Sequence, residues 1–312
     1  MRKKGIVILI SVAAVLAVGA LLWFTGVLGT RIGYANAAAY TAGEADIAEA
    51  VNNLDIHWIS GTVRIARHGE NTVLLRESAE RQPEGDMQLR WWLEDGTLHV
   101  QYGRDGARLP WRYHKDLTLT LPEGLALEET DIHVISGDLE IPDLRTDELN
   151  VKLTTGRVSV KADARSADIA ATSGDITLTL TGTADEVTAH TTTGDVTVTA
   201  EQVNRFSAES VTGDVRATLQ SAGSAHMSST TGSVTASLAR FDSLDVHVTT
   251  GSVTAFLPEQ PGFTAGLHKV TGSVSCELPA VQQGGEYVVG DGSARVDIGV
   301  TTGNITLKAL AE

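Results

Sequence analysis

A glycine preceded by Ser or Thr recurs along this chain at intervals of about 19 residues, each time within nearly the same phrase. The phrase reads HTTTGDVTVTA at 190–200, ATSGDITLTL at 171–180 and VTTGSVTAFL at 248–257. The recurring glycines are Gly137, Gly156, Gly174, Gly194, Gly213, Gly232, Gly251 and Gly272, with Gly303 after an insertion and Gly61 as an early outlier. A fixed period of this length is typical of a solenoid, in which each repeat packs only on its neighbours.

Apolar and polar residues alternate on both sides of each glycine. Val196 and Val198 follow Gly194 at every second position, and Val187 and Ala189 precede it. This period of two on both sides of a turn indicates two short strands per repeat, each with one face toward the interior and one face exposed to solvent. Stacked repeats of this kind bury a continuous core. The sequence therefore predicts an all-β fold, a single-layer-coil β-solenoid of about 19 residues and two strands per coil.

The residues beside each glycine suggest what the corner of a coil contains. The preceding Ser or Thr has the parity of the inward residues, so we expect its hydroxyl to satisfy a backbone group inside the corner. Asp175, Asp195 and Asp214 follow corner glycines and would stack about 4.8 Å apart, which makes them a weak candidate column for Ca²⁺. Arg157 and several serines interrupt this column, and Asp is common in turns. We therefore expect no metal and no cofactor.

Composition divides the chain into four segments. They are a cytoplasmic stub with a transmembrane anchor at 1–30, a linker at 31–45, a β-rich N-terminal cap at 46–130 and the solenoid repeats at 131–312. The apolar run at 5–29 is long enough to span a bilayer, and the basic residues before it favour a cytoplasmic N-terminus. The alternative is a signal peptide cleaved after Ala37. In both cases the bulk of the chain lies outside the cytoplasm.

The charge and the scarcity of reactive groups exclude several functions. The formal net charge of −15 opposes electrostatic binding to nucleic acid or to anionic lipid, and it suits the medium outside a cell. The single cysteine, Cys276, allows no intramolecular disulfide. The nine histidines show no metal-ligand spacing, and no P-loop, dinucleotide fingerprint or nucleophile elbow occurs. We therefore expect that this chain is not an enzyme.

Aromatic residues concentrate in the predicted cap. Trp91 has the parity of core residues, whereas Trp92 alternates to the other face. With Trp111, Tyr113 and Tyr102, Trp92 would form an aromatic platform for a glycan or a peptide. The alternative is that these aromatics cap the first coil of the solenoid.

The corner repeat, placed after a short N-terminal apolar segment, resembles a bacterial family of envelope proteins described as putative adhesins. The resemblance rests on LDIHWISGTVRI at 54–65 and on the repeated [ST]-G-[DS]-[VI]-x-[VAL] coils, and it covers about residues 40–312. It implies a domain of unknown function with β-strand repeats on a bacterial, often Gram-positive, cell surface, sometimes associated with envelope-stress systems. The family supplies no catalytic residues.

These observations lead to three functional hypotheses. The first is a non-enzymatic, membrane-anchored cell-surface β-solenoid, either an adhesin or a structural protein, which binds a cell-wall glycan or an envelope protein. The second is an accessory of an envelope-stress sensing system that acts through a membrane partner, because only about four residues would lie in the cytoplasm. The third is a carbohydrate-active β-helix enzyme.

Overall fold

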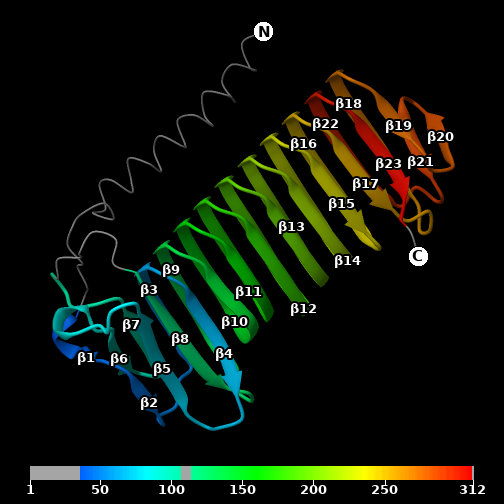
Figure 1. Cartoon of the computed structure of the whole chain (residues 1–312). Helices are drawn as coiled ribbons and strands as arrows, with labels where there is room; N and C mark the ends of the chain where they lie inside the picture. The colour runs from blue at the N-terminus through cyan, green and yellow to red at the C-terminus, as the bar shows by residue number, and fades with distance from the viewer. Residues whose placement is uncertain (1–35, 107–113, 311–312) are drawn as a thin grey trace.

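A computed structural model describes residues 36–106 and 114–310 of the chain. Figure 1 shows a long stack of strands with a group of shorter strands at its N-terminal end. Within the described ranges, no helix has the length and apolar character needed to cross a membrane. The predicted anchor at 5–29 lies outside the described residues. Two short 3-10 turns occur in the N-terminal part, η1 (Ala37–Ala39) and η2 (Gly85–Met87).

Five long strands form the centre of the stack. They are β10 (Leu139–Thr155), β11 (Val158–Ser173), β12 (Ile176–Thr193), β13 (Val196–Thr212) and β14 (Val215–Thr231). Each pairs with the next in parallel register, which places Val158, Ile176 and Val196 in one row. The strand ends only at the corner glycine. At the opposite corner it bends and continues, with a register shift in several coils, so the two predicted strands of each central coil merge into one.

Toward both ends of the stack a coil consists of two separate strands, as the sequence predicts. The N-terminal examples are β3 (Asn53–Ser60) with β4 (Val63–His68), and β9 (Leu127–Ser136), which leads into β10. The C-terminal examples are β15 (Val234–Leu238), β16 (Phe241–Thr250), β17 (Val253–Leu257), β18 (Phe263–Thr271), β19 (Val274–Cys276), β22 (Ala294–Thr302) and β23 (Ile305–Ala309).

The C-terminal coils do not stack in sequence order. β22 and β23 pair on one side with β16 and β17, and on the other side with β18 and β19. The last coil of the sequence is therefore inserted between two earlier coils. The insertion before Gly303 forms a hairpin of β20 (Ala280–Gln283) and β21 (Glu286–Val289), whose second strand covers the outer edge of β18 over Phe263–Ala265.

At the N-terminal end, too, the order of the coils in the stack differs from their order in the sequence. β7 (Thr97–Gln101) and β8 (Lys115–Pro122) form the outermost coil, stacked on β3 and β4. Their outer edges are covered by two antiparallel strands, β6 (Arg90–Glu94) and β5 (Val73–Ala79), and these pair in turn with β1 (Thr41–Ala42) and β2 (Ala45–Ile47). Because an open sheet edge invites pairing with other chains, this cover protects the N-terminal end.

The corner glycines stack directly on one another. From Gly61 to Gly303 their φ angles lie between +112° and +157°, a region that L side chains rarely adopt. A Cβ atom on Gly213 would lie 1.9 Å from the carbonyl oxygen of Gly194 in the coil below. Glycine is therefore required both by the backbone conformation and by the approach of the next coil.

The prediction for the Ser or Thr before each glycine is wrong. These side chains are exposed at nearly every corner, because the alternation of inward and outward positions ends where the chain bends. The hydroxyls that serve the corner lie two residues earlier. Thr191, Ser210 and Ser229 are buried and donate to the carbonyl oxygens of the preceding corner glycines at 3.1, 2.9 and 2.9 Å.

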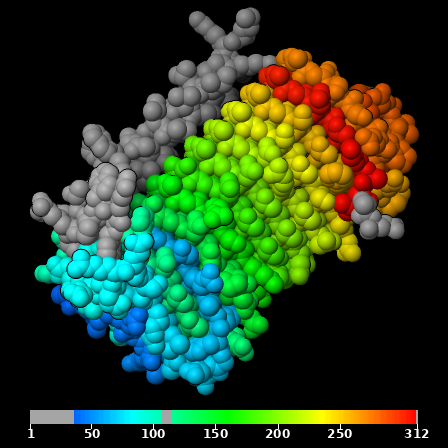
Figure 2. All heavy atoms as spheres, viewed as in Figure 1, coloured from blue at the N-terminus to red at the C-terminus, as the bar shows by residue number. Residues whose placement is uncertain are grey.

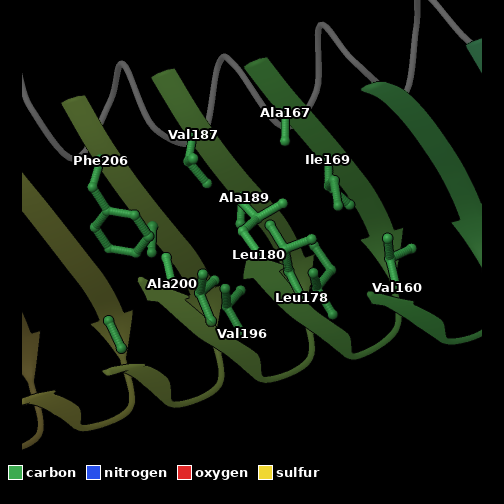
Figure 3. Close-up of a cluster of buried hydrophobic side chains, with 14 of the residues drawn as sticks. Val160, Ala167, Ile169, Leu178, Leu180, Val187, Ala189, Val196, Ala200 and Phe206 are labelled. Carbon is green, nitrogen blue, oxygen red and sulfur yellow. The ribbon is translucent and has the colours of Figure 1, made fainter. Parts of the chain in front are cut away.

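The core lies between the two layers that the coils form. In Figure 3, Ala167 and Ile169 from one layer and Leu178 and Leu180 from the other point into the same interior, and all four are buried. Burying a side chain of the Val or Leu type contributes about 1.5–3 kcal/mol. Small and medium apolar residues repeated in every coil therefore hold the layers together along the whole stack.

Candidate binding face

Each coil presents two outer faces to solvent. We call the outward side chains before the corner glycines the pre-glycine face, and those after them the post-glycine face. Figure 2 shows a continuous, stepped surface along the stack. Its hollows are grooves between rows of side chains, such as one of about 640 Å³ on the post-glycine face beside Arg64 and Arg157. Both of these arginines are already paired, with Glu140 and Asp138.

Aromatic rings gather on the pre-glycine face at its N-terminal end. Trp92 on β6 is half-buried and stacks on the ring of His99 on β7, with centroids 5.1 Å apart and planes at 24°. The ring of Tyr40 lies tilted against Trp92, with the two ring centroids 5.8 Å apart. Tyr40 accepts a hydrogen bond from the buried Gln101 side chain at 3.2 Å. The rings are therefore held in place before any ligand arrives.

A carboxylate connects these rings to the solenoid. Asp55 on β3 lies 2.7 Å from Nδ1 of His99 and 3.0 Å from Nε2 of His57. Burial alone would raise the pKa of Asp55, but hydrogen bonds from the two imidazoles outweigh it and hold that pKa below its usual value. Asp55 is thus a fixed negative charge that orients both histidines.

The row of rings continues onto the next coil. His133 on β9 lies against His57, with centroids 4.8 Å apart. Burial lowers the pKa of His133, and the nearby His57 and Lys152 lower it further, so this ring stays neutral at neutral pH. We call Tyr40, Trp92, His99, His57 and His133 the aromatic stripe.

The aromatic platform expected from the sequence is therefore built mostly from other residues. Trp92 lies on the surface as predicted, but its neighbours are Tyr40 and His99. Tyr102 is fully buried and packs edge-on against Trp58, at 4.9 Å between centroids. Trp111 and Tyr113 lie outside the described residues. Trp58 and Tyr102 instead pack with each other and with Lys115 inside the N-terminal coils.

Stacking of the coils aligns histidines that are scattered in sequence. Five of them lie four positions before a corner glycine, in one column of the pre-glycine face: His57, His133, His190, His247 and His268. His99 and His226 lie in the adjacent column. The signal was present in the sequence, since counting from each glycine gives the same offset. A search for spacing within one strand misses it.

The aspartates that follow corner glycines form a hydrogen-bonded ladder. Asp175 accepts the backbone N–H of Asp195 at 2.9 Å, and Asp195 accepts that of Asp214 at 2.8 Å. Asp214 accepts the N–H of Ser233 in the same way. Each carboxylate thus accepts a backbone N–H group of the next coil, which gives the aspartate column a structural role. Over 36–106 and 114–310, no three His, Cys, Asp or Glu side chains are grouped so as to hold a metal ion.

A buried ion pair joins the N-terminal strands to the stack. Lys115 takes the place of a corner glycine in the outermost coil, and its ammonium group contacts Glu77 and the carbonyl oxygen of Met87. The rings of Trp58 and Tyr102 lie 5.0 and 4.7 Å from its Nζ. Burial lowers the pKa of Lys115 to about 8, although Glu77 opposes this shift. Sequence reasoning missed the pair, because its partners are 38 residues apart.

Comparison with known proteins finds one matching family and several similar solved structures. The model of the Toastrack DUF4097 family matches residues 51–308. Solved structures similar to the chain include a putative adhesin from Parabacteroides merdae ATCC 43184, with 11% identity, TM-score 0.45 and coverage of 86% of this chain and 95% of that one.

Two further structures are similar over 86% of this chain, each at 12% identity. One is a putative adhesin from Bacteroides fragilis NCTC 9343, covered over 96% of its length with TM-score 0.40. The other is a putative cell adhesion protein from Clostridium sporogenes ATCC 15579, covered over 100% with TM-score 0.25. No curated protein matches the chain. Because the family match spans most of its length, this chain belongs to the Toastrack DUF4097 family.

Proposed function

We propose that this chain is a non-enzymatic, adhesin-type surface protein of a bacterial envelope, and that it binds a cell-wall glycan through the aromatic stripe. The stripe is the observation that carries this proposal. It places five rings side by side, four of them on strands, and Trp92, His57 and His133 are half-buried and so keep part of their surface open to a ligand. Aromatic faces supply apolar contact area at low entropic cost.

The polar groups of the stripe favour a sugar over an apolar peptide. Asp55 and the imidazoles of His57 and His99 lie beside the ring faces and can donate to and accept from hydroxyl groups. Because Asp55 fixes both imidazoles, little ordering is needed on binding. A glycan chain laid along the stack would contact successive rings.

The location of the protein forms part of the same proposal. The apolar segment at 5–29, preceded by Arg2, Lys3 and Lys4, would hold the solenoid at the outer side of the membrane. The negative net charge of the chain is compatible with the medium outside the cell.

Retention of the full-length chain on purified cell wall tests the proposal. Wild type should be retained, and Trp92→Ala should weaken retention at least about tenfold, because removal of an anchoring tryptophan costs about 2 kcal/mol or more. Phe256→Ala is the matched control, since Phe256 lies on the post-glycine face and is half-buried. It should bind like wild type.

Three results would contradict the proposal. The first is retention of wild type only on solubilised membranes through a membrane protein, which would indicate the envelope-stress accessory instead. The second is binding of Trp92→Ala to cell wall as strongly as wild type. Equal losses in Trp92→Ala and Phe256→Ala, with unchanged circular dichroism, would show that the stripe has no special part in binding.

A further inference from the structure

We propose that the C-terminal end of the pre-glycine face holds a second ligand site, one for an oxyanion such as a phosphate ester. The site is a groove of about 380 Å³ that crosses β14, β16, β22 and β18. His247, His268 and Lys269 line it together with the hydroxyls of Thr230, Thr249 and Thr301. It lies several coils from the aromatic stripe, and it does not rest on the proposed glycan binding.

The charge of the groove differs from that of the whole chain. The protein has 39 acidic and 24 basic residues, yet no Asp or Glu lines this groove. Its lining includes one ammonium group, two imidazoles and three threonine hydroxyls. An oxyanion needs this combination of a cation with several N–H and O–H donors.

Lys269 is the cation of the site. It stands in register with Val248 and Val300, which are buried in the neighbouring coils. In β18 the position is exposed, because this strand belongs to the last coil of the stack. Among the described residues Lys269 forms no ion pair, so its charge is available to a ligand.

A glycine in mid-strand opens the groove. Gly299 lies in one row with His247 and His268, in a column where several other coils carry a side chain. No left-handed φ requires glycine there. A Cβ atom on Gly299 would instead lie 2.9 Å from Nδ1 of His247. Glycine inside a strand often marks close approach of a ligand or another group, and here it leaves room beside an imidazole nitrogen.

Two aspartates lie beside the imidazoles, outside the lining of the groove. Asp245 lies 3.0 Å from Nε2 of His247, and Asp297 lies 3.7 Å from Nε2 of His268. Asp245 also contacts His226 at 3.3 Å, and Glu209 lies 3.9 Å from the same ring. With Nε2 of His247 turned to Asp245, its Nδ1 faces Gly299 and the groove. At the other end of the face, Asp55 likewise lies beside two imidazoles, those of His57 and His99.

Sulfate and inorganic phosphate are the probes that test the site. Titration of the full chain with either anion should shift the imidazole NMR signals of His247 and His268. Lys269→Met should weaken binding at least about tenfold, since it removes a charge-assisted contact. Gly299→Ala should weaken it as well, because the new methyl group displaces His247.

Lys152→Met is the matched control, because Lys152 is an exposed lysine on the pre-glycine face several coils away, in the column of His133. Binding should be unchanged in this variant. No shift of His247 and His268 at millimolar sulfate would overturn the proposal. An equal loss in Lys152→Met would overturn it too, because general electrostatics would then explain the binding. Binding to vesicles of phosphatidylglycerol is then compared with binding to vesicles of phosphatidylcholine. Binding only to the phosphatidylglycerol vesicles would identify a lipid head group as the natural ligand, and binding to neither would identify a soluble phosphate ester.

Discussion

Lys115→Met is expected to destabilise the protein by about 3–5 kcal/mol, because it leaves the buried carboxylate of Glu77 without its cation. The side chains of Lys115 and Glu77 are 0% and 4% exposed, so water cannot replace the lost partner. The N-terminal strands should be affected first, since the pair links β5 and the Met87 carbonyl to the outermost coil. The midpoint of urea unfolding measures the effect.

The double variant Lys115→Met with Glu77→Gln is the control for this result. It removes both charges and keeps an amide oxygen that can accept the N–H of Leu89, now bonded to Glu77. It should recover most of the lost stability. If Lys115→Met were as stable as wild type, the pair would not hold the cap to the stack.

The same pair predicts a dependence on pH. The folded-state pKa of Lys115 is lowered from 10.5 to about 8, so between these values the unfolded chain binds more protons at this site. The stability of wild type should therefore rise relative to Lys115→Met as the pH increases from 8 toward 10.

Gly213→Ala is expected to cost at least about 3 kcal/mol, or to prevent folding of the central coils. The φ of Gly213 is +147°, and the added Cβ would lie 1.9 Å from the carbonyl oxygen of Gly194. The two coils would have to separate at this corner, where Gly213 donates to Thr231 at 2.9 Å. The midpoint of thermal unfolding reports the change.

Gly124→Ala is the matched control. No atom lies within 4 Å of a Cβ at this turn, and its φ is outside the left-handed region. We expect a change within about 0.5 kcal/mol. A similar, small effect in both variants would show that the corner column tolerates side chains, contrary to the stacking described above.

The sequence predicts the coil well, because each coil repeats the same local requirements. The glycine phrase locates every corner, and the alternation around Gly194 identifies Val187, Val196 and Val198 as buried residues. The Ser and Thr residues before the corner glycines were predicted to point inward but are exposed, because the alternation of inward and outward side chains holds along a strand and not through a bend.

Threading and side-chain partners are harder to predict. The coil at 294–309 and the coil at 263–276 carry nearly the same corner phrase, so local pattern does not say which one lies beside β16 and β17. The partners within the aromatic stripe depend on that stacking. Trp92 was identifiable from its parity alone, whereas its contacts with Tyr40 and His99 required the position of β6 against β7.

Hydroxyl-radical footprinting of the full chain with soluble cell-wall fragments tests the central claim most directly, because it reads which side chains a ligand covers. We predict that oxidation of Trp92, Tyr40 and His57 falls when fragments are added, while that of Phe256 on the post-glycine face is unchanged. Unchanged oxidation of the aromatic stripe in the presence of bound fragments would contradict the account, as would equal protection of Phe256.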